Sequence, residues 1–164
     1  MLLAEIPDWT AFFAAEAGAA AALAGLLFVA MSINVKEILS YAWLPVRAIE
    51  TLVLLVGALL VASSALVPGL SERSLGVLML VVTGITWATP AVLQFRNRHL
   101  PNESPTSMTT TVCITQVATL PGVIGSLLLL AGRDNGLYFV AFGIMGCFIV
   151  AVVTAWVLLI EVLR

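Results

Sequence analysis

The chain has 164 residues, of which 62% are hydrophobic and 10% charged, and its mean hydropathy is +1.14. Soluble domains contain about 45–50% apolar and about 25% charged residues, so this composition excludes a water-soluble globular protein. A formal net charge of −2 carries no signal for nucleic-acid binding, and no cluster of Lys and Arg is present, so we predict no nucleic-acid partner.

Five apolar runs predict an all-α protein: one transmembrane domain over residues 1–164, a polytopic bundle of five membrane helices. A run of about 20 apolar residues is long enough to cross the hydrocarbon core of a bilayer. Pro45 favours a helix start, whereas Pro68 and Gly69 favour a helix end. We expect the spans at about residues 9–34, 45–67, 74–94, 108–131 and 138–163, joined by short connections.

The first span contains a carboxylate, Glu16, inside an otherwise apolar stretch. A charged side chain near the centre of a membrane helix costs about 2.5–3.5 kcal/mol on insertion scales, so it needs a polar neighbourhood. We expect Glu16 to be either protonated, or ionised and facing a water-filled cavity. By helical spacing it shares a face with Ala20, Leu23, Leu27 and Asn34.

Another face of the same helix carries small residues at helical spacing. Small side chains let membrane helices approach closely, so this face predicts a tight helix–helix contact, with a sliding or gating surface as the alternative. Because two faces are constrained, the first helix is expected either in the centre of the bundle or between the bundle and a neighbouring subunit. We call these residues the small-residue stripe: Ala14, Gly18, Ala22, Gly25 and Ser32.

Polar groups also occur within the later spans. Arg47 and Glu50 are i and i+3 neighbours near one end of the second span, close enough to pair. The pair either fixes the depth of the helix or forms a gate or inner ion site. The fourth span carries a narrow stripe of Thr. Their hydroxyls either donate to backbone carbonyls of the preceding turn or line a water-filled cavity.

Together these intramembrane polar residues are candidates for a path for a small cation or a proton, with one acidic residue in each half of the membrane. An acidic residue within a membrane span is by default a candidate for such a path. The candidate residues are Glu16, Asn34, Glu50, Thr51, Ser64, Thr83, Gln94, Thr111, Thr115, Gln116, Thr119 and Ser126.

The distribution of Lys and Arg predicts the orientation. With the N-terminus outside and the C-terminus in the cytoplasm, the cytoplasmic side receives five basic residues and the outer side two, Arg73 and Arg133. Cytoplasmic loops carry the excess of Lys and Arg, so this orientation is favoured. The five cytoplasmic residues are then Lys36, Arg47, Arg96, Arg98 and Arg164.

The sequence contains no recognisable metal-binding or catalytic motif. The single His, His99, is in a predicted loop, and Cys113 and Cys147 lie in apolar runs without further ligands nearby. A metal site needs several converging ligands, and no catalytic or phosphate-binding motif is present. We therefore predict no catalytic residue, no metal, no cofactor and no enzymatic function.

The segment 17–34, AGAAAALAGLLFVAMSIN, followed by LPVRAIE at 44–50, resembles a family of small bacterial membrane proteins that are uncharacterised. Some members carry an automatic label as modulators of a membrane-bound protease. The resemblance covers roughly the first 70 residues. It implies a multi-pass protein of the bacterial inner membrane and supplies no activity or site residue.

Three functions fit the sequence. The first is an oligomeric channel or channel-like transporter for a small cation or proton, which requires the polar residues to line a continuous hydrated passage. The second is a non-catalytic accessory or modulator subunit that binds another membrane protein, which requires a dry bundle and an exposed small-residue face. The third is a pocket for a lipid. The expected partners are the lipid bilayer, further copies of the chain and another membrane protein.

Overall fold

The structure, a computed structural model, describes residues 7–97, 105–133 and 135–162. This part of the chain forms six helices and no strand: α2 (Pro7–Ile33), α3 (Val35–Ser40), α4 (Leu44–Ala65), α5 (Glu72–Asn97), α6 (Pro105–Leu130) and α7 (Gly136–Val162). All but α3 are long and apolar enough to cross a membrane, so the predicted all-α class is confirmed and five helices correspond to the five predicted spans. Arg98, His99, Arg164 and the predicted end of the last span at 163 lie outside the described residues.

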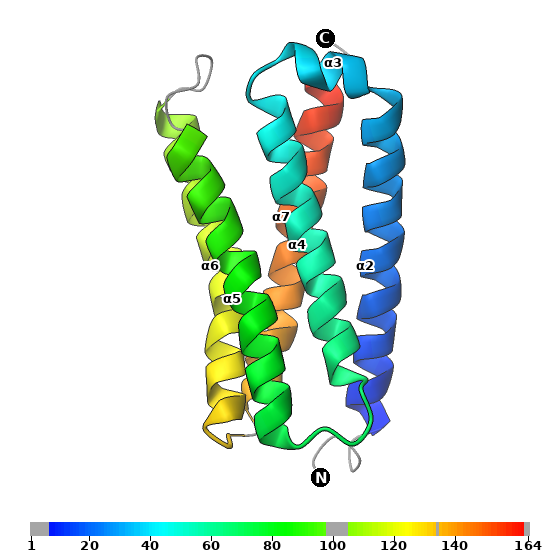
Figure 1. Ribbon diagram of the computed structural model, residues 1–164, viewed down its shortest axis with the longest axis vertical. Coiled ribbons are helices and arrows are strands. Elements are labelled where there is room, and N and C mark those ends of the chain that lie inside the picture. The colour runs from blue at the N-terminus through cyan, green and yellow to red at the C-terminus, as the bar shows by residue number, and fades with distance from the viewer. Residues whose placement is uncertain (1–6, 98–104, 134, 163–164) are drawn as a thin grey trace.

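The short helix α3 lies in a segment where the sequence predicted only a connection. The side-chain amide of Asn34 donates to the backbone carbonyl of Ala30 at 2.9 Å. The backbone carbonyl of Asn34 accepts from the backbone N–H of Ile38 at 2.9 Å. Ile38 is buried in a small cluster with Leu44 and Leu158. This cluster holds α3 across one end of the bundle (Figure 1). Six residues are too few for hydrophobic periodicity to reveal such a helix.

Helices α4, α5, α6 and α7 form a closed ring, in which each helix packs against two neighbours. Helix α2 lies outside this ring and packs mainly against α4 (Figure 1). In the most apolar window of α4, 61% of the residues are buried, against 17% in α2. The expectation that the first helix is central is therefore wrong, since α4 holds that position. A place for α2 between the bundle and a neighbouring subunit stays a prediction.

Helices α6 and α7 make the closest helix contact, through glycines. A Cβ added to Gly143 would lie 2.6 Å from the backbone nitrogen of Gly122. A Cβ added to Gly125 would lie 2.6 Å from the carbonyl oxygen of Gly136, and one on Gly146 would meet the backbone of Ala118 at 2.8 Å. Close approach of backbones through small residues is a main route to helix association in membranes.

The end of α6 shows how the sequence sets a tight turn. Gly132 has φ of 71°, a left-handed conformation that costs little without a Cβ. Its N–H donates to the carbonyl of Leu129 at 3.0 Å, and the N–H of Arg133 donates to that of Leu128 at 2.9 Å. These two bonds satisfy carbonyls that the helix end leaves open, and they direct the chain back into α7.

The basic residues of the described part of the chain divide between the two ends of the bundle. We call the end where α3 lies, α4 begins and α7 finishes the α3 end, and the other the opposite end (Figure 1). Lys36, Arg47 and Arg96 belong to the α3 end, whereas Arg73 and Arg133 belong to the opposite end. Helix α2 begins at the opposite end and α7 finishes at the α3 end, as an odd number of spans requires. The assignment of the α3 end to the cytoplasm stays a prediction.

Candidate functional site

Most of the predicted polar residues are buried in the bundle. We call the buried polar side chains of α4 to α7 the polar interior. Thr111 and Gln116 are half-buried beside it. Thr86 is a member that the sequence analysis missed, although it lies one helical turn from Thr83. The members are Glu50, Thr51, Ser64, Thr83, Thr86, Gln94, Thr115, Thr119 and Ser126.

The hydroxyl groups of the polar interior mainly satisfy their own helices. Thr119 donates to the carbonyl of Thr115, and Thr86 donates to that of Val82, each at 2.8 Å. Bonds of the same kind, from residue i to the carbonyl of i−4, are made by Thr51, Ser64, Thr83 and Ser126. Such bonds satisfy the hydroxyl donor within its own helix, which allows a polar side chain to be buried in a membrane bundle.

One direct contact joins two helices at the centre of the polar interior. The hydroxyls of Thr83 on α5 and Ser126 on α6 lie 3.2 Å apart, so one donates to the other when its proton turns away from the carbonyl of its own helix. Beside them is a cavity of about 20 Å³, lined by Thr83, Thr86 and Thr119 among apolar neighbours. A cavity needs on the order of 10–15 Å³ to hold a water molecule, so this space admits about one.

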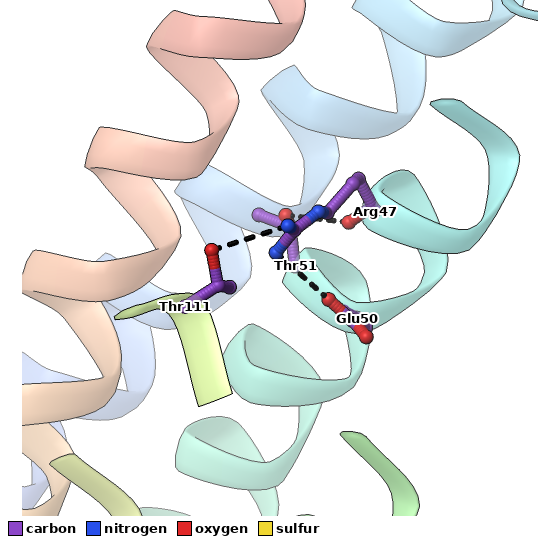
Figure 2. A network of polar contacts seen from close by, with 4 residues as sticks. All are labelled: Arg47, Glu50, Thr51 and Thr111. Carbon is purple, nitrogen blue, oxygen red and sulfur yellow. Dashed lines mark hydrogen bonds and ion pairs between the residues drawn. The ribbon is translucent and has the colours of Figure 1, made fainter. Parts of the chain in front are cut away.

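Arg47, Glu50, Thr51 and Thr111 form a polar cluster at the α3 end (Figure 2). The guanidinium of Arg47 lies 3.6 Å from the carboxylate of Glu50, so the pair predicted from the i, i+3 spacing is present. Arg47 also donates to the hydroxyl of Thr111 at 3.1 Å, which links α4 to α6 across the ring. The side chains of Arg47 and Glu50 are only 13% and 6% exposed. Arg47 thus closes the polar interior at this end.

Gln94 lies at about the same depth as this cluster. A Cβ on Gly57 of α4 would meet Thr86 of α5, which fixes the register of these antiparallel helices. Glu50 and Gln94 are each roughly two helical turns from that contact, in the direction of the α3 end. Gln94 is 6% exposed, and neither its oxygen nor its nitrogen has a hydrogen-bond partner in the structure as described.

Glu16 is separated from the polar interior. It faces the bundle from α2, on the same side as the buried residues Phe13, Ala20 and Leu27. Its Oε2 atom is buried without a hydrogen-bond partner among the described residues. Because α4 lies between α2 and the α5–α6 pair, Glu16 is not brought together with Thr83 and Ser126 (Figure 1).

Asn34, the last predicted member of the path on this helix, is bonded to Ala30 at the α3 end. The bond is local, from the side-chain amide to a carbonyl one turn earlier. Asn34 therefore marks the boundary between α2 and α3 and does not extend the path from Glu16.

The small-residue stripe lies on the outward face of α2. Ala14, Gly18, Ala22, Gly25 and Ser32 are all exposed. A Cβ added to Gly18 or Gly25 would meet nothing within 4 Å. The tight contact predicted for this stripe is therefore not made within the chain, and the closest small-residue packing occurs between α6 and α7. The α6–α7 packing could have been recognised from the seven-residue spacing of Gly136 and Gly143, which places both glycines on the same face of a helix.

The site thus consists of a polar interior closed by an ion pair at the α3 end, and of an outward stripe on α2. Among the described residues, no three His, Cys, Asp or Glu lie close enough together to hold a metal ion.

Comparison with family models, with curated proteins and with solved structures gave no match, so the resemblance of the first 70 residues stays an expectation.

Proposed function

We propose that the chain is a non-catalytic accessory subunit that binds another membrane protein inside the bilayer, through the outward face of α2. The observation that carries this proposal is the small cavity between the threonines of the polar interior, whose volume is about 20 Å³. The hydroxyl groups around it donate to carbonyls of their own helices. These polar groups thus serve packing, as buried polar side chains do when they are bonded within their own helices.

The size of the cavity weighs against conduction by a single chain. A file of water molecules spaced about 2.8 Å apart needs on the order of ten molecules to cross about 30 Å of hydrocarbon. The cavity of about 20 Å³ holds roughly one. Arg47 adds a positive charge at the α3 end, where it bonds to Thr111 across the ring. A cation that followed the polar interior would meet this guanidinium.

The exposed stripe on α2 supports binding to a partner. Gly18 and Gly25 have open space where a side chain would be, so another helix can approach the backbone of α2 closely. Helix α2 also sits at the edge of the bundle, with few of its residues buried. The stripe is thus available to a second protein without any rearrangement of the ring.

Site-specific photocrosslinking in the membranes of the native cells tests this proposal. A photoreactive residue at Ala22, in the stripe, should give an adduct whose added mass is not a multiple of 17.3 kDa. The same residue at Val81, on the exposed surface of α5, is the matched control and should give no discrete protein adduct. Adducts built only from further copies of the chain would refute the accessory role in favour of self-association.

A channel formed by several copies is the second candidate, favoured by the threonine-lined cavity. It predicts flux of protons, Na⁺ or K⁺ through liposomes that contain the purified chain, with a change when Glu16 is replaced by Gln. The accessory role predicts the same flux as in protein-free liposomes. Reproducible flux that scales with the amount of protein would decide for the channel.

A further inference from the structure

Helices α2 and α7 face each other across a groove at the edge of the bundle. At the opposite end they are joined by the rings of Trp9 and Tyr138, whose centroids are 4.9 Å apart. At the α3 end, Met31 of α2 and Ile38 of α3 pack in one cluster with Leu158 of α7. The space between these two contacts is a groove of about 310 Å³ that is open to the surface of the bundle.

The groove is almost entirely apolar. Its lining extends from Leu23 to Ile38 along α2 and α3, and from Ala151 to Leu159 along α7, with Leu55 of α4 contributing as well. The polar groups of the lining are the side-chain amide of Asn34 and the indole N–H of Trp156. Asn34 lies at the α3 end, where α2 gives way to α3.

The position of the groove restricts it to one half of the membrane. Helix α2 runs from Pro7 to Ile33, and the groove begins at Leu23, past the middle of that helix. From there to Ile33 the helix rises about 15 Å, which is half of a hydrocarbon core of about 30 Å. The groove therefore has the depth of a single leaflet, with its polar end at the membrane surface.

The depth and the volume of the groove suit an acyl chain. A methylene chain about 4–5 Å wide and about 15 Å long occupies on the order of 200–300 Å³. The groove, at about 310 Å³, has room for one such chain along its length.

We propose that this groove is a binding site for one acyl chain of a phospholipid from the leaflet at the α3 end, with the headgroup beside Asn34. The small side chains of Ala151 and Ala155 leave the space on α7, and the side chains of Leu23 and Leu27 form the facing wall on α2. Recognition rests on the apolar lining, so the site selects for the acyl chain. It does not depend on the accessory role or on the stripe, which faces away from the groove.

Native mass spectrometry of the purified, delipidated chain tests the proposal. Titration with a two-chain phosphatidylglycerol should give one lipid per chain in excess of a statistical distribution, and a single-chain lysolipid should bind as well. Glycerol phosphate, which offers the headgroup chemistry without the acyl chain, should not bind. Binding of glycerol phosphate alone, or the absence of a preferred single adduct, would overturn the proposal.

Filling the groove from either wall provides the matched comparison. Ala155→Phe on α7 and Ala30→Phe on α2 should each raise the Kd for the lipid by about tenfold, which corresponds to about 1.4 kcal/mol. Ala141→Phe places the same side chain at a half-buried position on α7 outside the groove and should leave binding unchanged. Two variants on opposite walls guard against the misfolding of one. Equal binding by both folded groove variants and the control would refute the site.

Discussion

The contact between α6 and α7 makes a direct prediction about stability. Gly143→Ala adds a methyl group that would lie 2.6 Å from the nitrogen and 2.8 Å from the Cα of Gly122. Both neighbours are backbone atoms of a helix, which cannot rotate away as a side chain can. To reach ordinary contact the helices must separate by about 1 Å, and overpacking of this kind costs about 1–3 kcal/mol.

Gly18→Ala is the matched control for this perturbation. It makes the same chemical change in another membrane helix, at a position where the added methyl group meets nothing within 4 Å. Replacing Gly by Ala within a helix contributes about 0.5–1 kcal/mol of stability in both variants. The difference between the two variants therefore isolates the steric cost, which we expect to be about 1–3 kcal/mol.

Unfolding of the purified chain in mixed micelles, with increasing mole fraction of sodium dodecyl sulfate, measures this difference. The four Trp residues provide the fluorescence signal. Gly143→Ala should unfold at a lower mole fraction than the wild type, and Gly18→Ala at the same or a higher one. Equal midpoints for the two variants would mean that α6 and α7 are not in contact at Gly143, and the assignment of the tight interface would be wrong.

Three further predictions concern the polar groups. In a double-mutant cycle of Arg47→Met and Glu50→Gln, unfolding free energies measured in mixed micelles should give a coupling of about 0.5–3 kcal/mol, and full additivity would contradict the ion pair. Thr83→Val should lower the unfolding free energy by about 0.6 kcal/mol through loss of the bond to Ser126, and by less once Ser126→Ala is present. Glu16→Gln should leave the proton permeability of proteoliposomes unchanged, as read by an internal pH-sensitive dye, and a change would bring Glu16 back into a conduction path.

The spans could be predicted from the sequence because hydropathy and length depend on each helix alone. The Arg47–Glu50 contact could be predicted for the same reason, since i, i+3 neighbours on a helix are close whatever surrounds them. The face of α2 that carries Glu16 was also recognised correctly as one row of residues, and it is the row that faces the bundle.

The pairing of helices could not be predicted in this way. Periodicity identifies a row of small residues, such as that of Gly18 and Gly25, but does not say which helix, if any, lies against it. The same limit applies to the path of polar residues. Their positions along the predicted spans place Glu16 and Thr83 at a similar depth in the membrane, yet α4 separates them in the bundle. Which helix is central depends on contacts between all of them at once.

The position of α4 has a consequence for how the chain is made. In chain order α2 comes before α4, its main partner in the finished bundle, and the ring that α4 joins is completed by α7. Until α4 emerges, the first helix must stay in lipid on its own hydrophobicity, with the carboxyl group of Glu16 not yet shielded by a neighbour. The least stable stage of insertion therefore comes before α4 is in the membrane, and the packing of α4 against α2 ends it.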